Sequence, residues 1–225
     1  GKMGKLILGI DEAGRGAVLG PLVIAGALIE EDRAKELVKL GVRDSKKLSP
    51  KQRADLYHRI RSKIKSHRII KVQPEEIDAN KKAEGNLNAL ELSHMAKIIN
   101  ELKPDVVYLD SIEANTMAVV SKLSPQLRVD CKIIAEIKAD DTYPIVSAAS
   151  ILAKVDRDDA VAALKPLYGE LGSGYPSDVV TQTFLRNWLN DHNDFPKIVR
   201  KTWETIEVLL GKKKQKQLGD YVNEI

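Results

Sequence analysis

The sequence predicts an α/β protein whose mixed sheet is flanked by helices, with a helical C-terminal region. Apolar runs at residues 5–11 and 21–29 follow each other with only a glycine-rich turn between them, which predicts two strands in succession. Strand-like runs then alternate with helical patterns, an order that is typical of α/β folds. Hydrophobic residues make up 43% of the 225 residues, enough for a sizeable core.

The remaining elements follow from local patterns along the chain. Charged helical sequence at 31–40 is followed by a loop at 42–48. Ser49 at the N-cap and Pro50 in the first turn then predict a helix over about 50–65. Beyond it we expect strands at 68–73, 105–110 and 131–137, helices at 86–102, 114–123, 144–164, 179–190 and 197–210, and a flexible glycine-rich stretch at 172–178.

Composition and charge narrow the class of protein. The formal net charge of +4 and the pI of about 9.0 are compatible with binding to nucleic acid. Cys131 is the single cysteine, which excludes an intrachain disulfide and a cysteine-rich zinc site and predicts a buried, inert thiol. No apolar stretch approaches the roughly 18 residues of a membrane span, and we see no signal peptide. We therefore expect a cytoplasmic protein without a membrane partner. We also expect a monomer.

Three predicted strands end in acidic residues: Asp11 with Glu12, Asp110, and Asp140. Ligand sites of open α/β sheets lie at strand ends, so these carboxylates are expected to converge. Converging carboxylates raise one another's pKa unless cations bind, and hard oxygen ligands suit Mg²⁺ or Mn²⁺. In a regular strand Asp11 and Glu12 would point to opposite faces. A shared site therefore requires the chain to leave strand geometry there, which Gly14 permits.

The glycine-rich turn after these acids can be compared with two known phosphate sites. Gly9 and Gly14 have the spacing of a P-loop, but Arg15 and Gly16 occupy its Lys and hydroxyl positions. The dinucleotide pattern also fails, because Gly14, Gly16 and Gly20 are spaced Gly-x-Gly-x-x-x-Gly. Both interpretations are weak. The alternative that each acid is a surface residue or a helix cap stays open on the residues alone.

The chain resembles the archaeal-type ribonuclease HII family in motifs that occur in the family's order and span most of its length. The motifs are Gly9–Gly16, Asp44–Leu48, Lys138–Asp141, Val146–Val155 and Gly172–Asp178. The resemblance implies a ribonuclease H-like fold with helices at its C-terminal end. It also implies cleavage on the 5′ side of a ribonucleotide, in RNA–DNA hybrids and in duplex DNA with embedded ribonucleotides, leaving 3′-hydroxyl and 5′-phosphate ends.

The resemblance also implies roles for individual residues. The family's catalytic, metal-binding acids correspond to Asp11, Glu12, Asp110 and Asp140. Two Mg²⁺ or Mn²⁺ ions held there would activate water and stabilise the attacking and leaving oxygens. The residues implied or considered for substrate binding are Gly14, Arg15 and Gly16 for the backbone, Tyr175 for stacking at the ribose–deoxyribose junction, and Lys46 for a phosphate.

The sequence departs from the family pattern at two positions. Ala17 stands where the family commonly has Pro, and Ile137 stands where it commonly has His before Lys-Ala-Asp. Two alternative functions fit the sequence less well. A junction resolvase of the same fold is disfavoured by the Tyr175 loop, and a hybrid-binding module without activity is disfavoured by the acids, which repel phosphate.

The end of the chain suggests a partner. We expect a catalytic domain over residues 1–210 and a basic tail over 211–225. Within the tail, residues 215–222 resemble a sliding-clamp-binding peptide, in which apolar side chains on a short helical turn enter a groove. Its candidate partner-binding residues are Gln215, Leu218, Tyr221 and Val222, with Val222 in place of the usual second aromatic residue. A tail that folds back or is disordered is the alternative.

Overall fold

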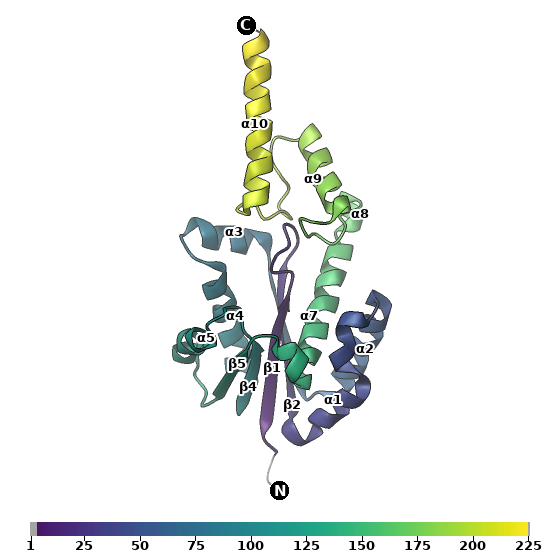
Figure 1. Cartoon of the computed structure of the whole chain (residues 1–225), viewed down its shortest axis with the longest axis vertical. Helices are drawn as coiled ribbons and strands as arrows, with labels where there is room; N and C mark the ends of the chain where they lie inside the picture. Colours follow the sequence, from purple (N-terminus) through teal and green to yellow (C-terminus); the bar gives the residue numbers. More distant parts are fainter. Residues whose placement is uncertain (1–3, 225) are drawn as a thin grey trace. The chain divides into compact units, whose positions relative to one another are not determined.

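The structure is a computed structural model that describes residues 4–224 (Figure 1). The side chains at positions 44 and 221–224 lie outside the description. None of the described helices is long and apolar enough to cross a membrane.

The described part of the chain forms a five-stranded sheet in the order β3-β2-β1-β4-β5. β1 pairs with β2 antiparallel and with β4 parallel, and β4 pairs with β5 parallel. The mixed sheet predicted from the sequence is therefore confirmed. The strands are β1 Leu6–Ala13, β2 Leu22–Glu30, β3 Ser66–Val72, β4 Val106–Asp110 and β5 Lys132–Glu136.

Helices occupy most of the connections between the strands. Short 3-10 helices are η1 Glu31–Arg33, η2 Val42–Lys47 and η3 Ser124–Gln126. The α-helices are α1 Ala34–Leu40, α2 Pro50–Lys63, α3 Pro74–Lys82, α4 Leu87–Leu102, α5 Thr116–Leu123, α6 Ala139–Thr142, α7 Pro144–Ala162, α8 Lys165–Tyr168, α9 Val179–Asp191 and α10 Glu204–Glu224. α2 begins as predicted, because the Ser49 hydroxyl accepts from the Gln52 N–H while the Gln52 side chain accepts from the Ser49 N–H.

Two compact units make up the chain. The first, called the sheet unit, consists of residues up to 13, 23–71 and 86–157. The second, called the helical unit, consists of residues 14–22, 72–85 and those from 158 onward. Each has its own apolar core. That of the sheet unit includes β1, β2 and α7, and that of the helical unit includes the 14–22 turn, α9 and α10.

Two glycines let helices pack directly on the central strands of the sheet unit. A Cβ atom on Gly9 would lie 2.3 Å from the carbonyl oxygen of Ile145, so the start of α7 contacts the backbone of β1. Gly26 lies opposite Ile10 in the register, and a Cβ atom there would lie 2.5 Å from Ile98 of α4. Because side chains alternate along a strand, α7 and α4 cover opposite faces (Figure 1).

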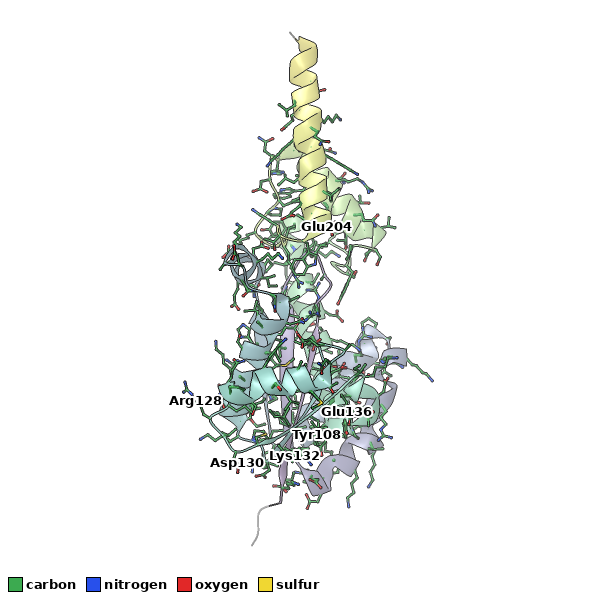
Figure 2. The ribbon with its side chains drawn as sticks, turned by 60° about the vertical axis from the view of Figure 1, so that its left-hand side comes forward. Tyr108, Arg128, Asp130, Lys132, Glu136 and Glu204 are labelled. Carbon is green, nitrogen blue, oxygen red and sulfur yellow. The ribbon has the colours of Figure 1, made fainter. Side chains whose placement is uncertain are left out.

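Strand β5 is one of the two edge strands of the sheet, and it runs from Lys132 to Glu136 (Figure 2). Cys131 lies directly before it and is half-buried, whereas the sequence predicted a buried residue. Burial raises the pKa of this thiol to about 11. The thiol therefore stays protonated near neutral pH, which agrees with the predicted inertness.

Several sequence-based boundaries were wrong. The segment at 42–48, predicted as a loop, is the 3-10 helix η2 up to Lys47, and α3 was not predicted. The last helix, predicted at 197–210, covers Glu204–Glu224 and continues through Gly211 and Gly219. Each of these glycines costs about 1 kcal/mol in a helix interior, but the Lys, Gln and Leu residues around them favour the helix.

Candidate functional site

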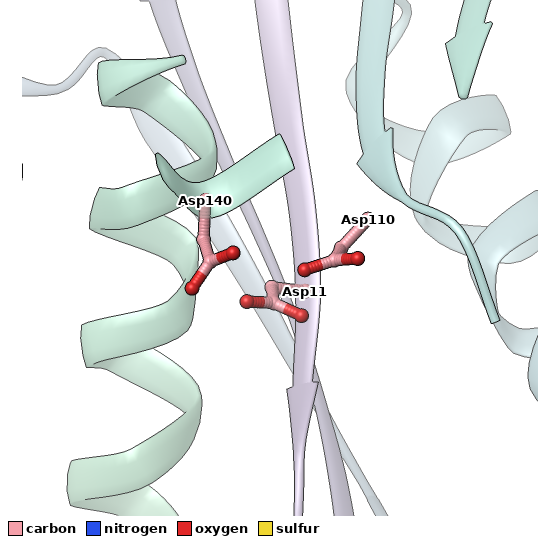
Figure 3. A group of neighbouring side chains, drawn as sticks. All are labelled: Asp11, Asp110 and Asp140. Carbon is pink, nitrogen blue, oxygen red and sulfur yellow. The ribbon is translucent and has the colours of Figure 1, made fainter. Parts of the chain in front are cut away.

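Three carboxylates of the sheet unit point toward one another (Figure 3). One oxygen from each of Asp11, Asp110 and Asp140 lies within 4.8 Å of the others. Asp11 is buried, and the other two residues are half-buried. The structure thus brings together three of the four acids that the sequence singled out.

The sheet topology explains why these acids meet. β1 and β4 are parallel neighbours with Ile10 opposite Leu109, so Asp11 and Asp110 lie side by side at the same end of their strands. Asp140 comes from the short helix α6, which follows β5. Before it, Lys138 adopts a left-handed conformation with φ of 56°, and its N–H donates to Asp110 Oδ1 at 3.2 Å.

Glu12 is the fourth predicted acid, and its position corrects the sequence analysis. The chain does not leave strand geometry at this point, because β1 stays in register with β2 through Ala13. Asp11 and Glu12 are consecutive residues of a regular strand, so their side chains point to opposite faces of the sheet. Glu12 is half-buried and does not belong to the group of three carboxylates.

Burial and mutual repulsion make these carboxylates hard to ionise. The pKa of Asp11 is raised to about 6. Burial is the largest cause and the charge of Asp140 adds to it, while a hydrogen bond from the Glu12 N–H acts in the opposite direction. The pKa of Asp110 is raised to about 7, first by burial and then by the charge of Asp11. A divalent cation between the carboxylates would remove this repulsion.

Helix α7 supplies two further groups to the carboxylates, which sequence analysis missed. The Ser150 hydroxyl forms a hydrogen bond with Asp11, and the charge of Lys154 also acts on it, both lowering the pKa of Asp11. Ser150 is buried and Lys154 is half-buried. Their four-residue spacing places both on one face of the helix, which is the available sequence signal.

Lys46, the predicted phosphate contact, forms ion pairs with acids of α6 in this structure. Its ammonium lies 3.0 Å from Asp141 Oδ1 and 3.6 Å from Asp140 Oδ2. The same 3-10 helix also places Arg43, whose guanidinium donates to the Thr142 carbonyl at 3.4 Å. η2 therefore contacts α6 at Asp140, Asp141 and Thr142. Ion pairs as exposed as that of Lys46 contribute little stability.

The glycine loop, residues 14–16, belongs to the helical unit together with Tyr175. Gly14 has a φ of 84°, a conformation that favours glycine, and its N–H donates to the Tyr175 hydroxyl at 3.1 Å. A Cβ atom on Gly16 would lie 3.9 Å from the Tyr175 ring. Three predicted substrate-binding residues, Gly14, Gly16 and Tyr175, are thus neighbours, and Arg15 lies between the two glycines.

The segment that carries Tyr175 is a hydrogen-bonded loop rather than the flexible stretch predicted. The Asp178 carboxylate accepts from the Ser173 N–H at 2.8 Å, and the buried Thr181 hydroxyl accepts from the Gly174 N–H at 3.0 Å. The loop is therefore tied to the first turn of α9. Its shape holds the tyrosine ring, whose residue is 37% exposed.

The three carboxylates suit a hard divalent cation. Carboxylate oxygens are the ligands that Mg²⁺ and Mn²⁺ prefer. Ligand oxygens around an octahedral ion with bonds of about 2.1 Å lie roughly 3–4 Å apart, and the three carboxylate oxygens here all lie within 4.8 Å of one another. The donor set of Asp11, Asp110 and Asp140 therefore fits such an ion with small side-chain movements.

Comparison with known proteins identifies the family. Residues 8–206 match the family model described as Ribonuclease HII. The chain is also 48% identical over 218 residues to the Ribonuclease HII of Thermococcus onnurineus, with 95% of each chain covered. The chain belongs to the ribonuclease HII family. As a member, it is a metal-dependent ribonuclease H, a hydrolase that acts on RNA–DNA hybrids.

Two solved structures of ribonucleases H have the same fold. The ribonuclease H2 from Pyrococcus horikoshii superposes with a TM-score of 0.87 at 41% identity, covering 93% of this chain and 99% of that one. The ribonuclease HII from Archaeoglobus fulgidus, solved as a complex with PCNA, superposes with a TM-score of 0.82 at 39% identity, covering 88% and 95%. The ribonuclease H-like fold expected from the motifs is confirmed.

The two departures from the family pattern have different surroundings. Ala17 is fully buried, and its N–H donates to the Gly14 carbonyl at 3.4 Å, so the glycine turn closes without Pro. Ile137 is 56% exposed directly after β5. An apolar side chain at this position cannot transfer a proton.

The raised pKa values of Asp11 and Asp110 predict how the stability of this ribonuclease HII family member depends on pH when no metal is bound. Asp11 and Asp110 hold protons up to about pH 6 and 7 in the folded protein but ionise near pH 4 when unfolded. The free energy of unfolding therefore falls as the pH rises from about 4 to 7. Asp110→Asn should be more stable than the unchanged protein at pH 8 by on the order of 1–2 kcal/mol, and equally stable near pH 4.

Urea unfolding in the presence of a chelator, repeated from pH 4 to pH 8, measures the difference in the free energy of unfolding between Asp110→Asn and the protein without the substitution. Asp55→Asn, at an exposed position on α2, is the control and should change little at any pH. A lower stability of Asp110→Asn at pH 8 would contradict the repulsion described here.

Proposed function

We propose that this chain is an endoribonuclease that hydrolyses the phosphodiester 5′ to a ribonucleotide, in RNA–DNA hybrids and in duplex DNA with embedded ribonucleotides. Its products would carry 3′-hydroxyl and 5′-phosphate ends, and the mechanism would use two metal ions. The observation that carries this proposal is the approach of the Asp11, Asp110 and Asp140 carboxylates within 4.8 Å in a family member.

Mg²⁺ or Mn²⁺ at these acids would supply Lewis-acid stabilisation and activation of water. Asp11, Asp110 and Asp140 would hold it, and Ser150 would keep the Asp11 carboxylate oriented. Glu12 remains a proposed ligand from the family resemblance alone. Its side chain can join the others only if the end of β1 departs from the regular alternation, next to the positive φ of Gly14.

The glycine loop would recognise the ribose. Its residues Gly14 and Gly16 lack side chains, so a sugar can approach their backbone closely, and the 2′-hydroxyl is the group that distinguishes RNA from DNA there. Tyr175, held against Gly14, would stack at the ribose–deoxyribose junction. Arg15 and Lys46 would contact phosphates, and Lys46 would have to exchange its contacts with Asp140 and Asp141 to do so.

A duplex with a single ribonucleotide tests the proposed activity. Incubation with Mg²⁺ or Mn²⁺ should give one nick, on the 5′ side of the ribonucleotide, and a chelator should abolish it. Asp140→Asn should reduce cleavage at least a hundredfold, because one of the three carboxylates that would hold the metal is lost. Binding of the duplex should be retained, because removal of a negative charge lowers the repulsion of phosphate. The matched control is Asp141→Asn, an exposed acid beside it, which should keep most of the activity.

Mapping both ends of the product on a sequencing gel, with and without phosphatase, gives the bond and the end groups. No metal-dependent nick at the ribonucleotide would refute the proposed activity. Cleavage by Asp140→Asn at the normal rate would remove Asp140 from the site.

We also propose that residues 211–225 bind a sliding clamp, while residues 1–210 carry the catalytic function. Gln215 and Leu218 lie on α10 and are exposed, with 65% of Leu218 accessible. The Archaeoglobus fulgidus relative, solved with PCNA, supports this kind of partner. The side chains of Tyr221 and Val222 lie outside the described residues.

Clamp binding can be measured by calorimetry with the clamp protein of the same organism. Removal of residues 215–225 should abolish binding, and Leu218→Ala should weaken it about tenfold, because an apolar anchor is lost. Val208→Ala is the control, since Val208 is a similarly exposed apolar residue of the same helix (48%) outside the motif. Unchanged affinity after the deletion would remove the proposed partner.

A further inference from the structure

Arg200 is the largest fully buried side chain of the helical unit, and its guanidinium reaches the glycine loop. Its Nη2 donates to the Gly14 carbonyl at 2.6 Å, and its Nη1 donates to the Arg15 carbonyl at 3.0 Å. Its Nε donates to the Gly20 carbonyl at 3.2 Å. One side chain thus binds carbonyls at both ends of the turn.

The backbone around Arg200 is fixed to the same turn. Its N–H donates to the Val18 carbonyl at 2.8 Å, and Leu19 and Val199 form an antiparallel bridge. The Trp203 ring lies 5.0 Å from the guanidinium carbon. These contacts leave the guanidinium little freedom to turn.

Asp78 of α3 holds the residues that follow Arg200. Its carboxylate accepts from the N–H groups of Lys201 at 3.0 Å and Thr202 at 3.1 Å, and from the Thr202 hydroxyl at 2.6 Å. Asp78 is buried, so these bonds act in a low dielectric. α3 is therefore connected through Asp78 to the segment that carries Arg200.

The geometry of the peptide bond links Arg200 to the donors of the glycine loop. In a trans peptide the C=O of one residue and the N–H of the next point in opposite directions. Because the Gly14 and Arg15 carbonyls point at Arg200, the N–H groups of Arg15 and Gly16 must point away from it. Arg200 therefore sets the direction of two backbone donors in the loop.

We propose that Arg200 is a positioning residue that fixes the Arg15 and Gly16 N–H groups for selection of a ribonucleotide over a deoxyribonucleotide. The inference rests on the proposed role of the glycine loop in ribose recognition. An arginine suits this task because its planar fork donates to several carbonyls in fixed directions, whereas a lysine ammonium is a point charge on a flexible stem. Arg200→Lys keeps the charge but loses the fork.

The test measures selectivity directly. Dissociation constants are measured in a chelator for two duplexes of the same sequence, one with a single ribonucleotide and one entirely of DNA. The ratio of the two constants should fall about tenfold in Arg200→Lys, the scale of one lost hydrogen bond, while affinity for the DNA duplex is unchanged. Asp78→Asn should also lower the ratio, but by a smaller factor. It is the variant to measure if Arg200→Lys does not fold.

Leu189→Ala is the matched control for loss of stability. Leu189 is a buried residue of α9 in the same unit, so its truncation should lower the melting temperature and leave the ratio unchanged. If Arg200→Lys folds and keeps the ratio of the two dissociation constants, the inference about Arg200 is wrong, while the proposed role of the loop stands. If Arg200→Lys does not fold, the same conclusion follows from an unchanged ratio in Asp78→Asn. If the protein without substitutions shows no preference for the duplex with the ribonucleotide, the proposed role of the loop is wrong, and so is the inference that rests on it.

Discussion

Repulsion among three carboxylates is the physical constraint that the rest of the sheet unit must accommodate. The fold places Asp11, Asp110 and Asp140 within 4.8 Å of one another with Asp11 buried, an arrangement that raises the pKa values of Asp11 and Asp110. Such a group is unfavourable for stability above neutral pH and useful only when a cation is bound. The parallel pairing of β1 with β4 and the left-handed turn before α6 impose the approach. Ser150 and Lys154 of α7 only partly compensate for it.

The helical unit has a different chemical character. There the important groups are backbone N–H and C=O groups of the glycine loop, held in place by a buried guanidinium, a tyrosine hydroxyl and a loop tied to α9. The chain passes from one unit to the other between Ala13 and Gly14. The acids proposed to hold a metal and the backbone proposed to recognise a sugar are therefore adjacent in sequence, although different interactions hold each of them.

Features of the structure that depend on a local sequence pattern can be predicted from the sequence. Features that depend on contacts between residues far apart in the chain cannot. An apolar run that ends in Asp is a local signal, so Asp11, Asp110 and the mixed sheet could be predicted. The fate of Glu12 could not, because pairing with β2 keeps β1 regular through Ala13. Arg200 was missed because its partners lie about 180 residues earlier in the chain.

The claim that Asp11, Asp110 and Asp140 form a metal site is tested most directly by counting protons. Calorimetric titration of the substrate-free protein with Mn²⁺, in buffers of different ionisation enthalpy, gives the number of protons released on binding. Because carboxylates with pKa values of about 6 and 7 must ionise to bind the ion, we expect release of roughly one proton or more at pH 6 and almost none at pH 8.5. Mn²⁺ binding with no proton release at pH 6 would contradict the account.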